Sequence, residues 1–407
     1  MNNDAKKIID EALREALPDS AVEKALKDIH FDQGKVILIS IGKAAWQMAK
    51  AAYDKLGERI ATGAVVTKYG HSKGDIGKLE IFEAGHPVSD ANTYLATQRC
   101  IELVSGLSKD DNVLLLISGG GSALFEKPLV TEEESQAITK QLLYCGADIV
   151  EMNTLRKRLS AVKGGRFAKL CQPAHVSSII LSDIIGDPLD MIASGPAYPD
   201  SSTTEQALKI IDKYSLHLSA KALECIKRPT PKSLDNVTSY ITGSVKQLCS
   251  SAAKTAKSLG YEPIFLTSSL NCEARDAGLF LSAIARDNED SDKKLAFIAG
   301  GETVVHITGK GKGGRNQEIA LAAADGIRNI KKCCIFSVGS DGTDGPTDAA
   351  GGCVDQDTAA KLEEKGINIA SVLKENDSYE ALKAVDGLIF TGPTGTNVND
   401  LTVLLLN

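Results

Sequence analysis

The stretch 337–352 combines acidic residues with an unusual number of glycines and contains no basic residue. Its carboxylates belong to Asp341, Asp344 and Asp348, and it follows an apolar segment, Cys334–Val338, that is typical of a strand. A loop of this kind can hold a cation or position a hydroxyl group. The spacing lacks the bidentate glutamate of a calcium loop. We therefore predict Asp341, the first acid after the strand, as a catalytic residue, and the other two as turn-formers.

A second pair of acids follows another apolar segment, 176–181. Asp183 and Asp187 stand in the sequence Ser-Asp-Ile-Ile-Gly-Asp-Pro, directly past the expected end of that strand. Such carboxylates can bind Mg²⁺ or act as a general base. The alternative is that they cap a helix or form a turn.

Two glycine-containing loops could bind an anion. Lys43 follows Gly42 at the turn between an expected strand, 36–41, and an expected helix, 44–56, where backbone N–H groups and an ammonium suit a carboxylate or phosphate. The most apolar strand candidate, 113–117, is followed by a loop in which consecutive glycines let a ligand approach the backbone. The residues of this loop predicted to bind phosphate are Gly119, Gly120, Gly121 and Ser122.

The segment 151–170 is strongly basic. If it is helical, Asn153, Arg156, Ser160 and Lys163 share one face, because offsets of three, four and seven residues align. That face could contact phosphates through Arg156 and Lys163, with Gly164 beside them. The alternative is a solvated basic face, although two glycines inside the segment are unusual for a helix interior.

The last candidate loops lie nearer the carboxyl end. Glu302 follows Gly300-Gly301, and a glycine–lysine loop, 309–314, leads into Arg315 and Asn316 at an expected helix start. Such a loop could hold a phosphate or carboxylate, and Arg315 would add a forked set of donors. The alternative is an exposed hairpin tip. Thr394 lies in a hydroxyl-rich turn that is either functional or simply turn chemistry.

The elements that position these loops alternate between strands and helices. This pattern predicts the α/β class, with mostly parallel sheets covered on both faces. The stretch 227–239 carries prolines and polar residues and predicts a boundary between an N-terminal Rossmann-like domain, 1–236, and a C-terminal domain, 237–407. Two such domains would form an interdomain active-site cleft at the carboxyl ends of their strands.

Composition excludes several classes of protein. The 407 residues are 43% hydrophobic and 24% charged with a net charge of −7, which argues against nucleic-acid binding. No apolar run is long enough to span a bilayer, and the N-terminus lacks a signal peptide. The nine cysteines have no paired spacing, so we expect reduced thiols and a cytoplasmic location. There is neither a Walker A loop nor a GxGxxG fingerprint.

Taken together, the loops resemble the glycerate 2-kinase family, whose C-terminal half is called the MOFRL domain. The resemblance extends over nearly the whole chain. The matching segments are Gly42–Ala45, Gly85–Pro87, Ser118–Ala123, Asn153–Gly165, Ser182–Pro196, Gly300–Thr303, Gly314–Glu318, Ser340–Gly345 and Thr394–Asn397. Each is weak alone, and their order and number make the match specific.

The resemblance implies two α/β domains, an active site between them, and transfer of the ATP γ-phosphoryl group to the 2-hydroxyl of D-glycerate with Mg²⁺. Lys43 and Arg315 match family positions placed in that cleft. We expect these two residues, with Asn316, Glu302 and Thr394, to bind substrate or the transferring phosphoryl group.

Two further roles stay open at the sequence level. Asp183 or Asp341 would act as base or Mg²⁺ anchor, and Asp187 would assist Asp183 with the metal. The expected partners are D-glycerate and ATP, without nucleic acid or membrane, in a monomer or homodimer. Members of the family are also labelled hydroxypyruvate reductases, so an NAD(P)H-dependent reductase is one alternative, although no nicotinamide fingerprint is present. A non-catalytic sugar-acid or nucleotide-binding protein is another.

Overall fold

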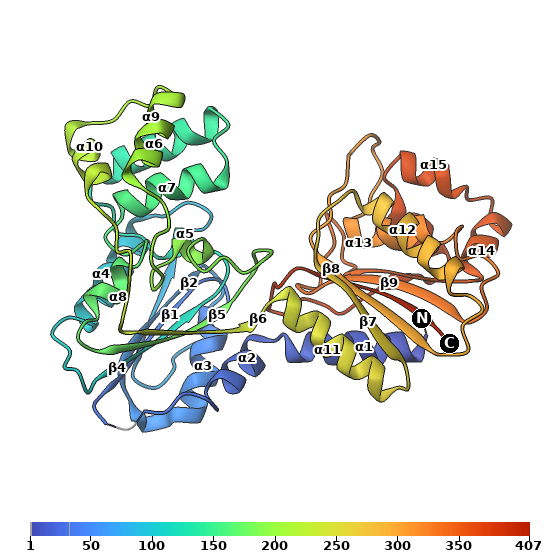
Figure 1. Cartoon of the computed structure of the whole chain (residues 1–407), viewed down its shortest axis with the longest axis horizontal. Helices are drawn as coiled ribbons and strands as arrows, with labels where there is room; N and C mark the ends of the chain where they lie inside the picture. Colours follow the sequence, from blue (N-terminus) through green and yellow to red (C-terminus); the bar gives the residue numbers. More distant parts are fainter. Residues whose placement is uncertain (1, 32) are drawn as a thin grey trace. The chain divides into compact units, whose positions relative to one another are not determined.

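The computed structural model describes residues 2–31 and 33–407. The chain forms two compact units (Figure 1). The N-terminal unit comprises Ala21–Leu181 and Asp187–Thr242, and the C-terminal unit comprises Met1–Ser20, Ser182–Gly186 and Gly243–Asn407. The predicted boundary near 237 thus lies close to the observed one. The first twenty residues, however, belong to the C-terminal unit, because apolar residues of the first helix pack there.

The N-terminal unit is built on a six-stranded sheet with the order β3-β2-β1-β4-β5-β6. Its strands are β1 (Val36–Ile41), β2 (Ile60–Lys68), β3 (Leu79–Ala84), β4 (Asn112–Ile117), β5 (His175–Leu181) and β6 (Val237–Gly243). The neighbours from β3 to β5 all pair in parallel. This is the strand order of a Rossmann fold, in which strands are added first on one side of β1 and then, from β4 on, on the other.

Helices cover this sheet and form a separate helical layer. They are α2 (Pro18–Ala25), α3 (Ala45–Leu56), η1 (Gly57–Arg59), α4 (Ala91–Leu103), α5 (Gly121–Leu124), α6 (Glu132–Tyr144), α7 (Ile149–Leu159), α8 (Arg166–Leu170), η2 (Ile192–Ser194), α9 (Thr204–Lys213) and α10 (Ala220–Lys227). The single helix predicted over 151–170 is wrong. Its interior contains an extended Ser160 and two glycines with positive φ, which end α7 and start α8.

The C-terminal unit has a second six-stranded sheet with the order β11-β10-β9-β12-β8-β7. Its strands are β7 (Glu262–Leu270), β8 (Leu295–Gly301), β9 (Cys333–Gly339), β10 (Gly351–Asp355), β11 (Leu388–Ile389) and β12 (Asp400–Leu406). Only β7 and β8 pair in parallel. The last strand, β12, runs between β8 and β9 and is antiparallel to both, and β10 pairs antiparallel with β9 and β11.

The α/β class with two sheets is therefore confirmed, and the parallel arrangement holds fully only in the first sheet. In the second, β7, β8, β9 and β11 share one direction, but oppositely directed strands lie between most of them. The cause is topological. No helix connects β9 to β10, and β12 is the last strand in the chain order. Neither strand is therefore placed by a helical crossover to a parallel neighbour.

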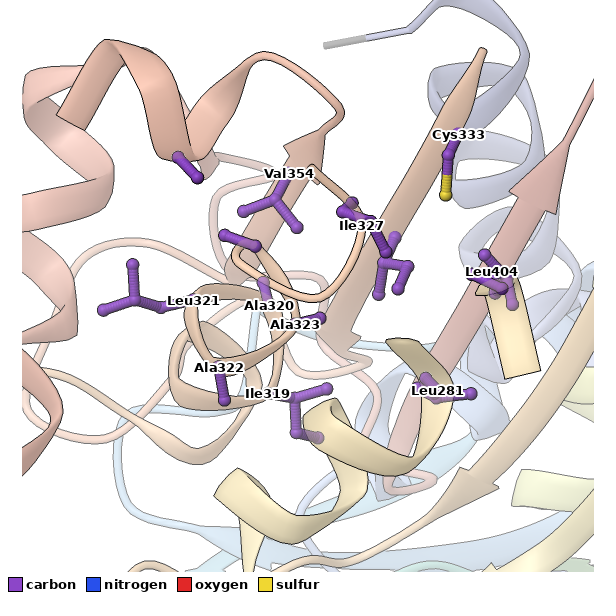
Figure 2. Close-up of a cluster of buried hydrophobic side chains, with 14 of the residues drawn as sticks. Leu281, Ile319, Ala320, Leu321, Ala322, Ala323, Ile327, Cys333, Val354 and Leu404 are labelled. Atoms are coloured by element: carbon purple, nitrogen blue, oxygen red, sulfur yellow. The ribbon is translucent and has the colours of Figure 1, made fainter. Parts of the chain in front are cut away.

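Helices pack on both faces of the second sheet (Figure 1). They are α1 (Asn3–Glu15), α11 (Val245–Ser258), α12 (Ala274–Asp287), α13 (Arg315–Ala323), α14 (Thr358–Glu364), α15 (Ile369–Lys374) and α16 (Ser378–Ala384). On one face α1 and α11 contact Ile298 and Val403. On the other, α12 and α13 belong to the cluster that contains Leu404, and Figure 2 shows Leu281 and Ile319 on these two helices. Because side chains alternate along a strand, β12 serves both cores.

No helix among the described residues has the length and apolarity needed to cross a bilayer. The cysteines are all free thiols, and most of them are buried. They therefore contribute to the cores as small apolar residues.

Candidate active-site loops

The loops after β1 and β4 lie side by side in the N-terminal unit. Gly42 has φ 114°, and a Cβ added to it would lie 2.3 Å from Ser118 Oγ. The backbone N–H of Lys43 donates to Gly119 O (2.9 Å), and Ala44 N–H donates to Ser118 Oγ (3.1 Å). Because the strand order reverses between β1 and β4, the loops occupy the topological switch point, where ligands of such sheets bind.

Within this pair of loops, the glycine run presents unused backbone donors. Gly119 and Gly120 are partly exposed, and their N–H groups have no acceptor among the described residues. Gly120 has φ 85°, and a Cβ there would lie 2.9 Å from His86 Nε2 and 3.2 Å from Lys43 Cγ. A Cβ on Gly121 would lie 2.7 Å from the Cβ of Ala193. The glycines thus allow protein groups to approach the loop closely, and the N–H groups of Gly119 and Gly120 remain free to bind an anion.

His86 contributes to the same place, although sequence reasoning assigned it no role. Burial, followed by the positive charges of Lys43 and Lys68, lowers the pKa of His86. The imidazole is therefore neutral at pH 7 and adds a polar but uncharged group beside Gly120 and Lys43. The sequence signal was its place in the segment Gly85–Pro87, one of the segments that carry the resemblance.

Lys163 has a different role from the one predicted. Its side chain is fully buried, and its ammonium donates to Ser122 O (2.9 Å) and Phe125 O (2.7 Å) and pairs with Glu126 (3.0 Å). Burial lowers the pKa of Lys163 to about 8, and the charge of Glu126 opposes that shift. With all three donors engaged, this lysine fixes the end of the glycine-rich loop and does not reach a phosphate directly.

Arg156 and Gly164 also border this loop. Arg156 is partly exposed, and its Nη2 donates to Ser122 O (3.1 Å). Gly164 has φ 57° and donates its N–H to Ser194 O (3.0 Å). Of the predicted basic face, Arg156 is thus the cation with exposed surface beside the loop, while Gly164 holds the backbone that supports it.

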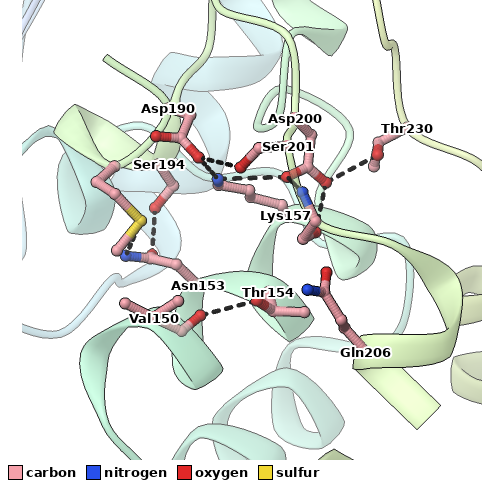
Figure 3. A network of polar contacts seen from close by, with 12 residues as sticks. Val150, Asn153, Thr154, Lys157, Asp190, Ser194, Asp200, Ser201, Gln206 and Thr230 are labelled. Carbon is pink, nitrogen blue, oxygen red and sulfur yellow. Dashed lines mark hydrogen bonds and ion pairs between the residues drawn. The ribbon is translucent and has the colours of Figure 1, made fainter. Parts of the chain in front are cut away.

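A polar chain links the glycine-rich loop to α7, and Figure 3 shows its contact between Ser194 and Asn153. Ser122 Oγ lies 2.9 Å from Ser194 Oγ, which donates to Asn153 Oδ1 (2.9 Å). Ala193 and Ser194 both have positive φ, a conformation that costs free energy in residues other than glycine and persists only when the surroundings impose it. The bonds to Ser122 and Asn153 are the local reason that Ser194 keeps it.

The remaining basic residues of α7 form internal ion pairs and carbonyl contacts. Lys157 is buried and pairs with Asp190 (3.0 Å) and Asp200 (3.3 Å), as Figure 3 shows. Arg158 is also buried and donates to Ser202 O (3.1 Å) and Ile226 O (3.2 Å). The alternative of a solvated basic face is therefore wrong.

The acids after β5 differ from each other. Asp183 belongs to the C-terminal unit and Asp187 to the N-terminal unit. Asp187 has φ 52°, and its Oδ1 is buried without a hydrogen-bond partner among the described residues. A buried carboxylate oxygen without a donor is unusual and fits a cation ligand. Within the described chain, no cluster of three or more His, Cys, Asp or Glu side chains is arranged for a metal.

The C-terminal unit contains a pocket of about 760 Å³ near the start of α13. Arg315 dominates it. Arg315 Nε and Nη2 donate to Asp400 (2.5 and 3.1 Å), and Nη1 donates to Glu302 (3.0 Å). Burial opposes the charge of this guanidinium, but the hydrogen bond and charge of Asp400, together with Glu302, raise its pKa overall. Asp400, which sequence reasoning missed, comes from the first residue of β12.

Asp344 is more than the turn-former that was predicted. Its carboxylate accepts the backbone N–H groups of Asn316 (3.1 Å) and Gln317 (2.9 Å) and so satisfies the first turn of α13. Burial raises the pKa of Asp344 to about 6. Asn316 is itself buried, with its amide on Asp344 and its oxygen accepting from Ser337 (2.5 Å). Asn316 therefore supports Arg315 and does not face the pocket.

Asp341 and Glu302 line the pocket, and Thr394 is absent from its lining. Asp341 is partly exposed, with Oδ1 accepting from Thr343 N–H (3.0 Å). Thr394 uses its hydroxyl to bond Ser340 O (2.5 Å) and its N–H to bond Asp341 O (3.2 Å). It therefore holds the loop that carries Asp341 and leaves the carboxylate available.

The glycine–lysine loop before Arg315 packs against another loop and also lines the C-terminal pocket through Gly311, Gly313 and Gly314. A Cβ on Gly309, Gly311 or Gly313 would lie within 2.4 Å of residues 375–378. The N–H of Gly309 donates to Asn376 Oδ1 (2.9 Å) and that of Gly311 to Glu375 O (2.8 Å). These glycines serve close packing between two loops. The loop connects β8 to α13 and is therefore not a hairpin tip, and Lys310, Gly311 and Lys312 are exposed.

Comparisons with known proteins agree with the motifs. Residues 4–227 match a family described as a domain of unknown function, DUF4147, and residues 295–400 match the MOFRL family. A D-glycerate 2-kinase of Thermotoga maritima is 52% identical, with 99% of this chain and 97% of that protein covered. A glycerate 2-kinase of Pyrococcus horikoshii is 40% identical, with 98% and 96% covered.

The solved structures include a close counterpart. The crystal structure of a glycerate kinase from Thermotoga maritima has a TM-score of 0.95 at 51% identity and covers 99% of both chains. Because both family matches and the near-complete alignments agree with the motif resemblance, the chain belongs to the glycerate 2-kinase family.

Proposed function

We propose that this chain is an ATP-dependent kinase that phosphorylates the 2-hydroxyl of D-glycerate, giving 2-phosphoglycerate and ADP. The observation that carries the proposal is the switch point of the first sheet, where Lys43 and the free N–H groups of Gly119 and Gly120 converge. Charge moves onto phosphate oxygens in such a reaction, so preorganised donors are what the chemistry requires. The names of the two relatives, D-glycerate 2-kinase and glycerate 2-kinase, agree with the proposed reaction.

The reaction divides among a few side chains. The glycerate hydroxyl oxygen bonds to the γ-phosphorus, the bond to the bridging oxygen of ADP breaks, and the hydroxyl proton passes to a carboxylate. Asp183 and Asp341 are the two candidates for that base. Lys43 would stabilise the transferring phosphoryl group, and Arg315 would bind the substrate carboxylate, with Glu302 at its side.

Phosphate binding falls to the glycine-rich loop. Gly119, Gly120 and Gly121 offer backbone donors or close approach, Ser122 has a hydroxyl, and Arg156 adds a positive charge at the same edge. Lys163, Gly164, Asn316 and Thr394 act by holding these groups and those of the substrate pocket in place.

Mg²⁺ is the proposed cofactor. The unpartnered, buried Oδ1 of Asp187 fits a hard cation, and Mg²⁺ needs only one or two carboxylates when substrate phosphates supply further oxygens. Asp183 and Asp187 would hold it. Bound there, the ion would neutralise charge on the phosphate oxygens. The cytoplasmic location and the monomer or homodimer state stay predictions.

The decisive experiment measures ADP release from D-glycerate and MgATP, followed by an enolase-coupled readout that detects only the 2-phosphate. We expect activity in both. Oxidation of NAD(P)H is followed by the loss of its absorbance at about 340 nm. Such a loss with hydroxypyruvate, without release of ADP, would instead identify a reductase. Saturable binding without turnover would identify a non-catalytic ligand-binding protein.

A further inference from the structure

A second pocket, of about 350 Å³, lies in the N-terminal unit between α6, α7 and residues 87–89. Its wall is mainly apolar, with Ile138 and Leu142 from α6 and Leu155 and Leu159 from α7. None of the residues predicted from the sequence to contact D-glycerate lies in it. Pockets of roughly 300–1,000 Å³ with apolar walls and a few polar groups are typical of small organic ligands.

This pocket adjoins the glycine-rich loop through three of its lining residues. Ser89 Oγ donates to Ala123 O (2.7 Å), and Arg156 Nη2 donates to Ser122 O (3.1 Å). Glu126 pairs with the buried Lys163, which also holds Ser122 O. A ligand that fills the pocket can therefore continue onto the loop without leaving the N-terminal unit.

The chemistry of the two neighbouring regions differs in a way that fits a nucleotide. The pocket offers apolar surface with polar groups from Gln136 and Thr139 on α6, whereas the loop offers free N–H groups and the charge of Arg156 at the junction. A flat heterocycle with polar edges matches the first, and phosphates match the second. Glycerate would leave its carboxylate and hydroxyls unpaired against the leucines, which is costly.

We propose that this pocket receives the adenine base of ATP, with its phosphates leading past Arg156 to Gly119 and Gly120. The inference rests on the proposed kinase function and adds the place where the base is bound. The guanidinium of Arg156 then marks the boundary between base and phosphates.

The test introduces a large side chain into the pocket from α6. Thr139→Trp places a large side chain at a lining position, and Ala137→Trp places the same side chain on an exposed, non-lining position of the same helix. We expect Thr139→Trp to raise the KM for ATP at least about tenfold relative to Ala137→Trp, with the KM for D-glycerate changed less than about twofold. Inhibition by inorganic tripolyphosphate, which lacks a base, should be the same in both.

Leu143→Trp, at an exposed lining position on α6, provides a second variant if Thr139→Trp does not fold, as judged by circular dichroism. An unchanged KM for ATP in a folded pocket variant overturns the base site. A pocket variant that loses tripolyphosphate binding as strongly as ATP binding also overturns it. A pocket variant whose molar mass changes while its KM for ATP does not would identify the pocket as a contact between copies of the chain, which overturns it as well. A wild-type chain that releases no ADP would instead refute the underlying kinase function.

Discussion

Two loops with nearly the same sequence signature have opposite surroundings in the two units. Both the run 118–122 and the loop 309–314 follow a strand, are rich in glycine and lie near a basic residue. In the first, glycines bring Lys43 and His86 close and leave backbone donors free. In the second, glycines allow packing against residues 375–378, and Gly311, Gly313 and Gly314 also line the pocket that contains Arg315. The comparison teaches that glycine content marks close approach, and that the neighbouring atoms decide what approaches.

The charges at the two places differ as well. The switch-point loops combine Lys43 and Arg156 with unused N–H groups, so a polyanion is the natural ligand. In the C-terminal pocket, Arg315 is shared between Asp400 and Glu302, and Asp341 lies near them in the lining. With these acids around a single arginine, the C-terminal pocket is less suited to a string of phosphates than the switch-point loops are.

The largest expected effect tests whether each region contributes a cation to catalysis. Lys43→Ala and Arg315→Ala should each lower kcat/KM by about 10²–10³-fold, because each removes a charge that contacts the transferring phosphoryl group or the substrate. Lys50→Ala and Arg328→Ala, exposed cations in the same units, are the matched controls. Values within about threefold of wild type would contradict the assignment for the residue concerned.

The next effect tests the claim that Lys163 supports the glycine-rich loop from inside. Lys163→Met should lower the free energy of unfolding by about 3–5 kcal/mol, since Glu126 and two carbonyl groups would lose their buried partner. Urea denaturation measures it, with the exposed Lys169→Met as control. A stable variant with weakened nucleotide binding would instead favour direct phosphate contact.

The pH dependence of stability tests the raised pKa of Asp344, the buried acid of the C-terminal unit. Because burial raises the pKa of Asp344 to about 6 from an ordinary value of 3.8, the native state binds its proton more tightly than the unfolded state. The resulting stabilisation is full below pH 3.8 and is lost as the pH rises through 6, by roughly 2–3 kcal/mol. The stability of wild type minus that of Asp344→Asn, from urea denaturation, should therefore fall between pH 4 and pH 7. A constant difference would contradict the raised pKa.

The smallest effect concerns how Arg315 is held. Asp400→Asn weakens the paired contact to the guanidinium and should lower kcat/KM by about tenfold. If Asp400 acts only through Arg315, the same substitution should cost nothing further in an Arg315→Ala background. Additive losses would mean that Asp400 has a separate role. Asp386→Asn, an exposed acid in the same unit, serves as control.

Much of the fold follows from local pattern. The apolar runs at 36–41 and 113–117 are strands, and the predicted helix 44–56 begins one residue later than expected. The apolar run at the end of β12 is equally readable, but the position of β12 between β8 and β9 depends on long-range pairing. The mixed second sheet could not be derived, because strand order and direction are not encoded in the periodicity of a single segment.

For the site, the candidate loops are readable without coordinates, because they place glycine, lysine, arginine and aspartate at strand ends, and their order identified the family. Only the tertiary structure decided what each residue does. Lys163 and Asp344 have the composition of ligands but are buried and bonded to backbone groups, whereas Asp400 looked like an ordinary strand residue and holds Arg315. Burial and hydrogen-bond partners arise from segments far apart in the chain, and these decide whether a charge faces a ligand or supports the protein.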